Sequence, residues 1–312
     1  MISVIQAVLA AAMAPVAVSL PDGVASTIAE VRSRASAGDS IWPGYGSAPF
    51  GFLLVQESGE VLLCDDRVPA GFAKAEPLAG LDCPVATGPS SWRKPFLLAA
   101  MPVFGPGEVI VMGTPEATGL KPADWRRTIL HEHFHQWQAT LPGYHQRIDA
   151  LALAGDDQNG MWMINYAFPY KRDDVVKAHR AAADALLAAL AAPNREVKRK
   201  AAKYWRLRGQ FERTVSADQW RYFDFQLWKE GVARWSEIAI ARRFGGDWAS
   251  DAEAAWARTL KELTTSDLAK DERVAVYAFG AGEAALLERV RPGWRECYRQ
   301  TVRLGDCWKT RT

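Results

Sequence analysis

The 312-residue sequence has almost no excess of charge of either sign. It contains 38 Lys and Arg residues against 36 Asp and Glu residues, a net charge of +2. Proteins dedicated to nucleic acids usually carry a strong positive excess, so we expect no nucleic-acid partner. Beyond its N-terminus the sequence also lacks an apolar run long enough to cross a bilayer. We therefore expect no stable membrane span after removal of the N-terminal segment.

The N-terminal segment lacks Lys and Arg. Residues 1–19 are apolar and rich in Ala, and the small residues Ala17 and Ser19 offer a cleavage site. This pattern predicts a secretory signal peptide, and hence a periplasmic or secreted protein. Because basic residues are missing ahead of the apolar region, an uncleaved anchor and a buried first helix are alternatives.

Cysteine is scarce, and none of the four cysteines is spaced C-x-x-C, which argues against a Cys₄ zinc site. Four cysteines allow three disulfide pairings. The local pairing, Cys64 with Cys83 and Cys297 with Cys307, closes two short loops and fits an oxidising compartment. The alternative is four buried thiols in a cytosolic protein.

Histidine is rarer than expected for a chain of this length, yet three of the five histidines lie in the segment from His131 to His135. The segment reads H-E-x-x-H, and on a helix its first and last histidines share one face, about 6 Å apart along the axis. Two imidazoles so placed can bind one Zn²⁺, with Glu132 as the general base that deprotonates the attacking water. The alternative is a polar helix whose histidines pair with carboxylates.

The rest of the sequence predicts a sheet followed by helices, an α+β arrangement. Apolar runs bounded by turn residues predict strands at 50–56, 60–64, 96–103 and 108–112. Periodic segments predict helices at 121–140, 174–192, 195–215, 217–243, 251–263 and 271–291. We expect a small, mostly antiparallel sheet in residues 20–120, packed on the histidine helix, and a mainly helical part in residues 121–312.

A catalytic zinc site usually has a third protein ligand, and the sequence offers several. The H-E-x-x-H-x-x-G-x-x-H pattern is absent, because Gln138 and Leu141 stand at its Gly and His positions. Residues of the following loop are conceivable ligands, although loop acids near turns are more often solvated or capping. These loop candidates are His145, Asp149, Asp156 and Asp157.

Glu230 is the strongest candidate for the third ligand. It lies in the segment W-K-E-G-V-A-R-W-S-E, where Gly231 and Ala233 would let this helix approach another closely. Glu237 lies seven residues later on the same helical face, where it could accept a hydrogen bond from a ligand histidine. The alternative is a surface helix with two solvated acids.

The H-E-x-x-H helix, followed by an E-G-x-A-x-(aromatic)-x-E helix, resembles the gluzincin metallopeptidases, the aminopeptidase- and thermolysin-like clan, and especially its poorly characterised bacterial members. The resemblance covers about residues 108–289. It implies a single zincin-like catalytic domain, residues 20–312, that holds one Zn²⁺ per chain and hydrolyses peptide or protein substrates. It further implies His131, His135 and Glu230 as zinc ligands and Glu132 as the base.

Two further roles follow from the resemblance. Tyr277 lies in a Tyr-x-x-Gly helix similar to the one that supplies an oxyanion-stabilising tyrosine in aminopeptidase-like gluzincins. In this clan the strand before the zinc helix often pairs with substrate backbone through an exposed edge. By that rule the substrate-binding residues are Glu108, Val109, Ile110, Val111 and Met112.

The sequence also departs from the family pattern. A helical insertion at 171–215 separates His135 from Glu230, and Lys229 stands where Asn usually precedes the ligand Glu. The Gly-x-Met-Glu-Asn segment that binds a free amino group in aminopeptidases is missing, so we expect an endopeptidase-like enzyme. The alternative function is a zinc-binding but inactive module for binding or assembly. Retention of Glu132 counts against that alternative, because a structural zinc site needs no base.

Overall fold

The computed structural model describes residues 19–91, 98–157 and 159–309, and in them one six-stranded sheet forms. The strands are β1 (Phe52–Gln56), β2 (Gly59–Leu63), β3 (Ala73–Lys74), β4 (Val85–Gly88), β5 (Leu98–Met101) and β6 (Val109–Gly113). Their order is β3-β4-β2-β1-β6-β5. Only β1 and β6 pair in parallel, and the other neighbours are antiparallel. The predicted antiparallel sheet is thus present with one parallel pairing.

The remaining described chain is mainly helical, so the α+β expectation holds at this level. Before the sheet lie α1 (Val24–Arg34) and η1 (Ala35–Ser40). After it come α2 (Pro115–Thr118), α3 (Pro122–Ala139), α4 (Tyr144–Asp149), α5 (Trp162–Asn165), α6 (Asp173–Leu190), α7 (Asn194–Glu212), α8 (Ala217–Gln226), η2 (Leu227–Gly231), α9 (Val232–Phe244), α10 (Gly246–Thr265), α11 (Leu268–Asp271), η3 (Glu272–Val274), α12 (Ala275–Val290), α13 (Trp294–Gln300) and α14 (Asp306–Lys309).

The central strands of the sheet are buried on both faces. In β1, Phe52 and Leu54 belong to the main core shared with the helices, whereas Leu53 and Val55 belong to a smaller cluster on the opposite face. Strand β6 divides in the same way, and every one of its residues is buried. A strand buried on both faces reads as a continuous apolar run, which matches the sequence V-I-V-M.

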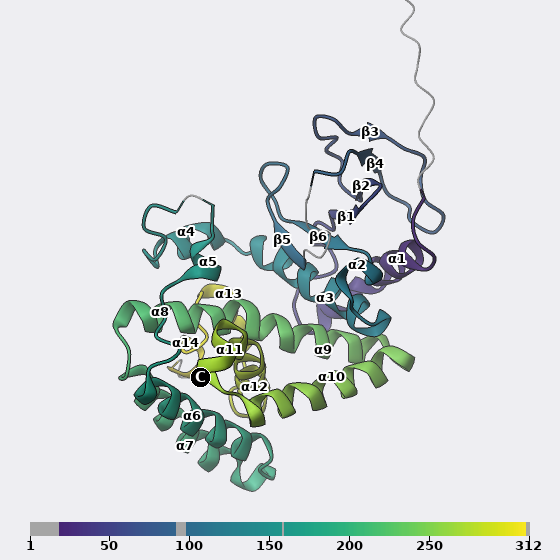
Figure 1. Cartoon of the computed structure of the whole chain (residues 1–312). Coiled ribbons are helices and arrows are strands. Elements are labelled where there is room, and N and C mark those ends of the chain that lie inside the picture. The colour runs from purple at the N-terminus through teal and green to yellow at the C-terminus, as the bar shows by residue number, and fades with distance from the viewer. Residues whose placement is uncertain (1–18, 92–97, 158, 310–312) are drawn as a thin grey trace, which may run out of the picture.

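Helix α3, which carries the H-E-x-x-H segment, packs against β5 and β6 on one side and against α9 and α1 on others. It begins with Pro122 in its first turn, where proline is well tolerated. The indole nitrogen of Trp125 donates to the carbonyl of Gly113 at 2.8 Å, which ties the start of α3 to the end of β6. Figure 1 shows the sheet and α1 to α3 at one end of the molecule, with α6 to α8 at the other.

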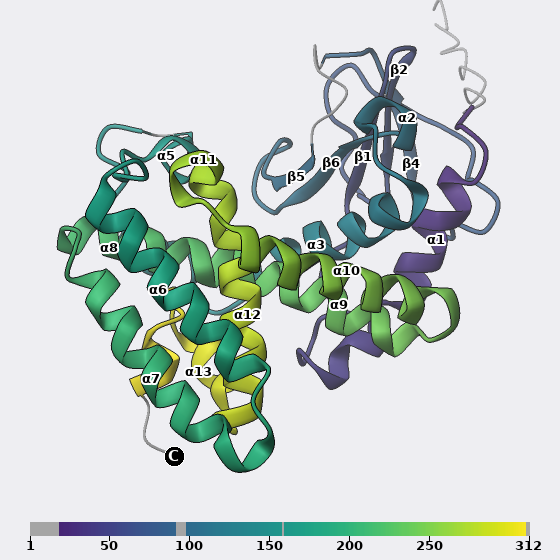
Figure 2. The same ribbon diagram turned by 60° about the horizontal axis from the view of Figure 1, so that its bottom comes forward.

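The predicted insertion at 171–215 is a helical hairpin. Helices α6 and α7 pack along each other, and α6 also contacts α12 and α10 (Figure 2). The chain turns at Pro193, the predicted break, which immediately precedes α7. A Cβ at Gly282 of α12 would come within 3.1–3.4 Å of three leucine side chains, so a small residue is suited to this packing.

The helix predicted at 217–243 is interrupted by one π-helical turn. Helix α8 runs into the π-helical turn η2, and α9 follows without a break in the chain direction. Gly231, at the end of η2, packs directly on α12, because a Cβ there would lie 2.4 Å from the Cα of Gly280. The close helix approach predicted from Gly231 is therefore confirmed, and it places Glu230 next to α12.

Both predicted disulfides are present, Cys64–Cys83 and Cys297–Cys307. They fit an oxidising compartment. The predicted signal peptide at residues 1–19 lies outside the described residues except for Ser19. No helix in residues 19–91, 98–157 and 159–309 is both long and apolar enough to span a membrane.

Candidate metal centre

Three potential metal ligands converge between α3 and η2. His131 and His135 project from one face of α3, and Glu230 comes from η2. The Oε2 atom of Glu230 lies 3.4 Å from Nε2 of His131 and 3.3 Å from Nε2 of His135. One ligand atom from each residue lies within 4.8 Å of the others, so the group could hold a metal ion. Glu230 is thus the third member that the sequence favoured.

The loop candidates for the third ligand do not belong to this group. His145 is exposed and stacks edge-on against Tyr144. Asp157 accepts hydrogen bonds from the backbone N–H groups of Asn159 and Trp162, which is the turn-capping role considered from the sequence.

The outer nitrogen of His131 is held by a carboxylate. Nδ1 of His131 lies 2.8 Å from Oε2 of Glu237, as expected from the spacing of Glu230 and Glu237. Arg127, one turn before His131 on α3, donates from Nε to the other oxygen of Glu237 at 2.9 Å. The sequence reasoning missed Arg127, although its position four residues before His131 places it on the same helical face.

The outer nitrogen of His135 is held by an amide. Nδ1 of His135 lies 2.6 Å from Oε1 of Gln138, three residues later on the same helix. Gln138 is fully buried, so its amide can orient the imidazole without competition from water. The sequence reasoning noted Gln138 only as a departure from a glycine pattern, although the spacing of three residues was a usable signal.

Charge in the centre is set by burial and by short contacts. Burial alone would lower the pKa of His131, but hydrogen bonds to Glu230 and Glu237 outweigh it and raise the pKa to about 10. Burial alone would raise the pKa of Glu230, but His135, His131 and Lys229 hold it well below its usual range. Glu230 is therefore ionised, as a metal ligand must be, and a metal ion would replace the proton between His131 and Glu230.

Glu132, the predicted base, lies beside the end of the sheet. Its Oε2 atom accepts a hydrogen bond from the backbone N–H of Ala100 in β5 at 2.8 Å. Strand β5 pairs with β6 alone, so it is the last strand on this side of the sheet in the described part of the chain. The N–H of Ala100 points away from β6 and toward Glu132 of α3.

The prediction that residues 108–112 offer a free edge to substrate is wrong. Strand β6 pairs with β1 on one side and with β5 on the other, so Val109, Ile110, Val111 and Met112 have no open edge. Their side chains are also fully buried in the two cores. Among the described residues, the strand at the edge of the sheet near Glu132 is β5.

Glu108, at the start of the same stretch, lies near the metal centre. One of its carboxylate oxygens is buried without a hydrogen-bond partner among the described residues. Burial raises the pKa of Glu108, while Lys229, His135 and His145 act in the opposite direction. Lys229 donates from Nζ to the hydroxyl of Tyr144 at 3.3 Å.

Tyr277 lies at the rim of the centre. Its ring stacks on that of His131 with the centroids 5.9 Å apart. Burial raises the pKa of Tyr277, Glu230 adds to the rise and Arg273 opposes it, so the phenol stays protonated and can donate a hydrogen bond. Arg273 also lies 3.8 Å from Oε1 of Glu230, the carboxylate oxygen that does not face the histidines.

No protein-family model, no curated protein and no solved structure matches this chain. The gluzincin assignment therefore stays a prediction that rests on the motif residues and on their geometry.

Proposed function

We propose that this protein is a zinc-dependent peptidase that hydrolyses internal peptide bonds in an exported setting. One observation carries the proposal: His131, His135 and Glu230 converge next to the buried carboxylate of Glu132. Zinc bonds of about 2.0–2.1 Å in tetrahedral geometry separate neighbouring ligand atoms by about 3.3–3.4 Å. The separations of Glu230 from the two histidines, 3.4 and 3.3 Å, agree with this geometry.

The chemical nature of the three ligand atoms also supports zinc. Two imidazoles and one carboxylate leave a fourth position open, which is the composition of a catalytic rather than a structural zinc site. Glu237 and Gln138 accept from the Nδ1 atoms, so both Nε2 atoms can present lone pairs to the metal. Bound there, Zn²⁺ would supply a Lewis acid for the scissile carbonyl.

Glu132 would act as the general base and then as the general acid. It would take a proton from the attacking water and deliver it to the leaving amine. Its hydrogen bond from Ala100 keeps one carboxylate oxygen directed at β5, which orients the group. Protonated Tyr277 would donate to the oxygen that gains charge as the carbonyl is attacked.

In this proposal the substrate binds along the outer edge of β5, in place of the edge expected at residues 108–112. An extended peptide can add to β5 as a further strand through main-chain hydrogen bonds. A peptide so placed would pass Ala100 and therefore Glu132, because these two residues are already hydrogen-bonded. Main-chain pairing gives affinity for extended, unfolded segments without selecting particular side chains.

Zinc content and peptide hydrolysis, measured together, test the proposal. The purified protein should hold about one Zn²⁺ and cleave casein or members of a peptide library, and a chelator should abolish the cleavage. Glu132→Gln should keep the zinc but lower kcat by about 10²–10⁴-fold, because an amide cannot accept the proton. Glu116→Gln, on an exposed residue of α2, is the matched control and should behave as wild type.

The outcomes separate the alternatives. Wild-type turnover by Glu132→Gln would reject Glu132 as the base. Stoichiometric zinc without cleavage of any peptide would reject the peptidase and favour the binding or assembly module. Absence of tightly bound zinc would reject both.

A further inference from the structure

A buried tyrosine near the C-terminus contacts both elements that carry the metal ligands. Tyr298 lies on α13 and has no exposed surface. Its ring packs on Trp42 and Trp228, with centroids 4.9 and 5.0 Å apart. It also lies among aromatic side chains of α3, Phe134 and Trp137. A phenylalanine would pack in the same way, so these ring contacts do not explain the hydroxyl group.

The hydroxyl of Tyr298 makes two hydrogen bonds that join α3 to η2. It accepts from Nε2 of Gln138 at 2.6 Å and donates to the backbone carbonyl of Trp228 at 3.0 Å. In return, the indole nitrogen of Trp228 donates to the carbonyl of Tyr298 at 3.1 Å. Gln138 orients the ligand His135, and Trp228 lies two residues before the ligand Glu230. Tyr298 thus connects Gln138, which orients His135, with the backbone that precedes Glu230.

These hydrogen bonds have a fixed direction. A carbonyl can only accept, so the hydrogen of Tyr298 goes to Trp228, and the phenol oxygen must accept from Gln138. The Gln138 amide therefore presents its nitrogen to Tyr298 and its oxygen to His135. The carbonyl of Lys229, at 3.4 Å from the same nitrogen, favours the same orientation more weakly. An amide oxygen accepts from Nδ1–H, which leaves the lone pair of His135 on Nε2, the atom that faces Glu230.

We propose that Tyr298 is a positioning residue of the metal site, which fixes the Gln138 amide and thereby the tautomer of His135 while it anchors the backbone before Glu230. The proposal rests on the proposed metal centre, and it does not depend on peptidase activity. Without the hydroxyl, the Gln138 amide can rotate by half a turn and present its N–H₂ group to Nδ1. That orientation favours a proton on Nε2 and so opposes metal binding.

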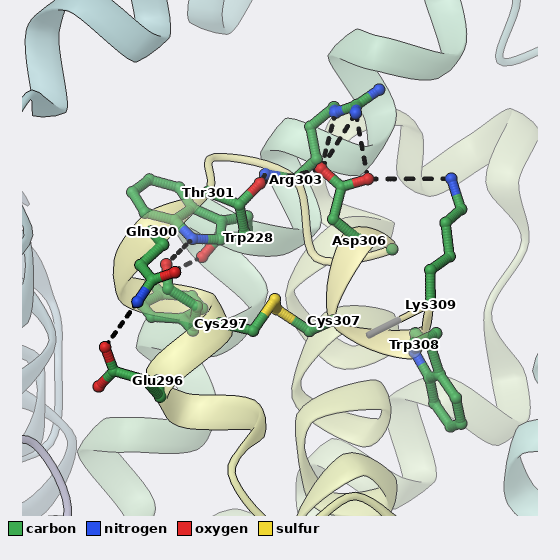
Figure 3. Close-up of a disulfide and its surroundings, with 12 residues drawn as sticks. Trp228, Glu296, Cys297, Gln300, Thr301, Arg303, Asp306, Cys307, Trp308 and Lys309 are labelled. Carbon is green, nitrogen blue, oxygen red and sulfur yellow. Dashed lines mark hydrogen bonds and ion pairs between the residues drawn. A yellow bond between two sulfur atoms is a disulfide. The ribbon is translucent and has the colours of Figure 1, made fainter. Parts of the chain in front are cut away.

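The second disulfide holds this residue in place. Cys297, directly before Tyr298, is bonded to Cys307 in α14, and Figure 3 shows this bond beside Trp228. Helix α13 has seven residues, too few to be stable by itself. The connecting segment is further closed by Asp306, which accepts from Thr301 and Arg303. The cross-link therefore supports the position from which Tyr298 reaches the metal site.

Zinc affinity of the full, disulfide-bonded chain is the test, measured by competition with a chromophoric chelator and without any substrate. Tyr298→Phe keeps the ring and removes the hydroxyl, and we expect it to weaken zinc binding about tenfold, within the range typical of outer hydrogen-bond partners. The visible spectrum of the Co²⁺-loaded variant should change, because His135 is no longer held in one tautomer.

Tyr204→Phe is the matched control. Tyr204 is also a fully buried tyrosine, but its neighbours are Glu283 and Arg208 and not groups of the metal centre. It should keep wild-type zinc affinity and a wild-type Co²⁺ spectrum, and urea unfolding without zinc measures any change in its stability. This comparison separates a general effect on packing from an effect on the site.

A double-mutant cycle tests whether Tyr298 acts through Gln138. Gln138→Met removes the amide and keeps a side chain of similar size. Because this variant retains Tyr298, it can still test the connection if Tyr298→Phe does not fold. We expect Gln138→Met to weaken zinc binding about tenfold, and the double variant to lose clearly less than the product of the two single losses. A loss equal to that product would overturn the connection between the two residues.

Two other results would overturn the inference. If wild type binds zinc tightly and Tyr298→Phe binds it equally well, Tyr298 has only a packing role, and the proposed function stands. If wild type does not bind zinc, the proposed function fails, and this inference fails with it.

Discussion

His179 provides a test of how strongly the helical part of the fold resists acid. Its side chain lies on α6 and is completely buried, and neither ring nitrogen has a hydrogen-bond partner among the described residues. The ring lies between aromatic side chains, with centroid distances of 5.6 Å to Phe211, 6.3 Å to Phe223 and 5.1 Å to Phe279. A charged imidazolium in this environment would have no solvation and no partner.

Burial lowers the pKa of His179 to about 3, and the neighbouring Arg180 adds to the shift. In the unfolded chain a histidine titrates near 6.5. Because the pKa of His179 is lower in the folded chain than in the unfolded chain, the free energy of unfolding is not reduced by this residue above about pH 6.5. It decreases as the pH falls from 6.5 toward 3, where the unfolded chain binds a proton that the folded chain does not. Between pH 8 and pH 5, this residue alone should lower the free energy of unfolding by about 2 kcal/mol.

His179→Leu should remove this contribution. The free energy of unfolding would be measured in urea at pH 8 and pH 5, with the disulfides intact and a chelator present. The loss between the two pH values should be about 2 kcal/mol smaller in the variant than in wild type. His145→Leu, at an exposed position, is the control and should keep the wild-type difference. Equal pH dependence in wild type and His179→Leu would refute the reasoning.

Two more predictions concern the metal centre. Replacing Cys297 and Cys307 with serine should weaken zinc binding about tenfold, because Tyr298 loses its tether. Replacing Cys64 and Cys83 with serine should leave zinc binding unchanged. Competition with a chelator measures zinc binding in both variants, and equal effects would contradict the role of Tyr298 as a positioning residue. Glu230→Ala removes a ligand and should weaken zinc binding by more than the roughly 100-fold limit of outer partners, and a smaller loss in the same assay would exclude Glu230 from the site.

The helical half of the site was predictable because its signals are local. His131 and His135 share a face whatever the rest of the fold does, and a helix of this kind needs only its own periodicity to be identified. Glu230 was a less local prediction, and the structure brings it to both histidines in a group that could hold a metal ion. Gly231 beside it predicted a close helix contact. The contact exists, with Gly280 of α12 as its partner.

The edge strand beside Glu132 was not predictable from the same kind of signal. The run at 108–112 is a strand, but strand neighbours depend on pairings between residues far apart in the sequence. The continuous apolar run Val109–Met112 in fact indicated burial on both faces, and hence an interior strand. The weaker run that contains Ala100 forms the edge instead, and only the sheet order reveals this.

The residues that hold His135 in place could be predicted from the sequence only in part. Gln138 lies at a helical spacing that suggests contact with His135, so half of that hydrogen-bond chain could have been found from the sequence. Its other half, Tyr298, comes from the C-terminal helix, and no local pattern connects it to α3. The sequence analysis also predicted one continuous helix at 217–243 and not the π-helical turn η2 that carries Glu230.

The long chain segment between His131 and Glu230 does not prevent their convergence. His131 and Glu230 are 99 residues apart in sequence, and the hairpin of α6 and α7 lies between them. That hairpin packs on α12, whereas the position of Glu230 is set by Gly231 against Gly280 and by Trp228 against Tyr298. Convergence of His131, His135 and Glu230 therefore depends on contacts of η2 with α12 and α13 and on the packing of α3 against α9.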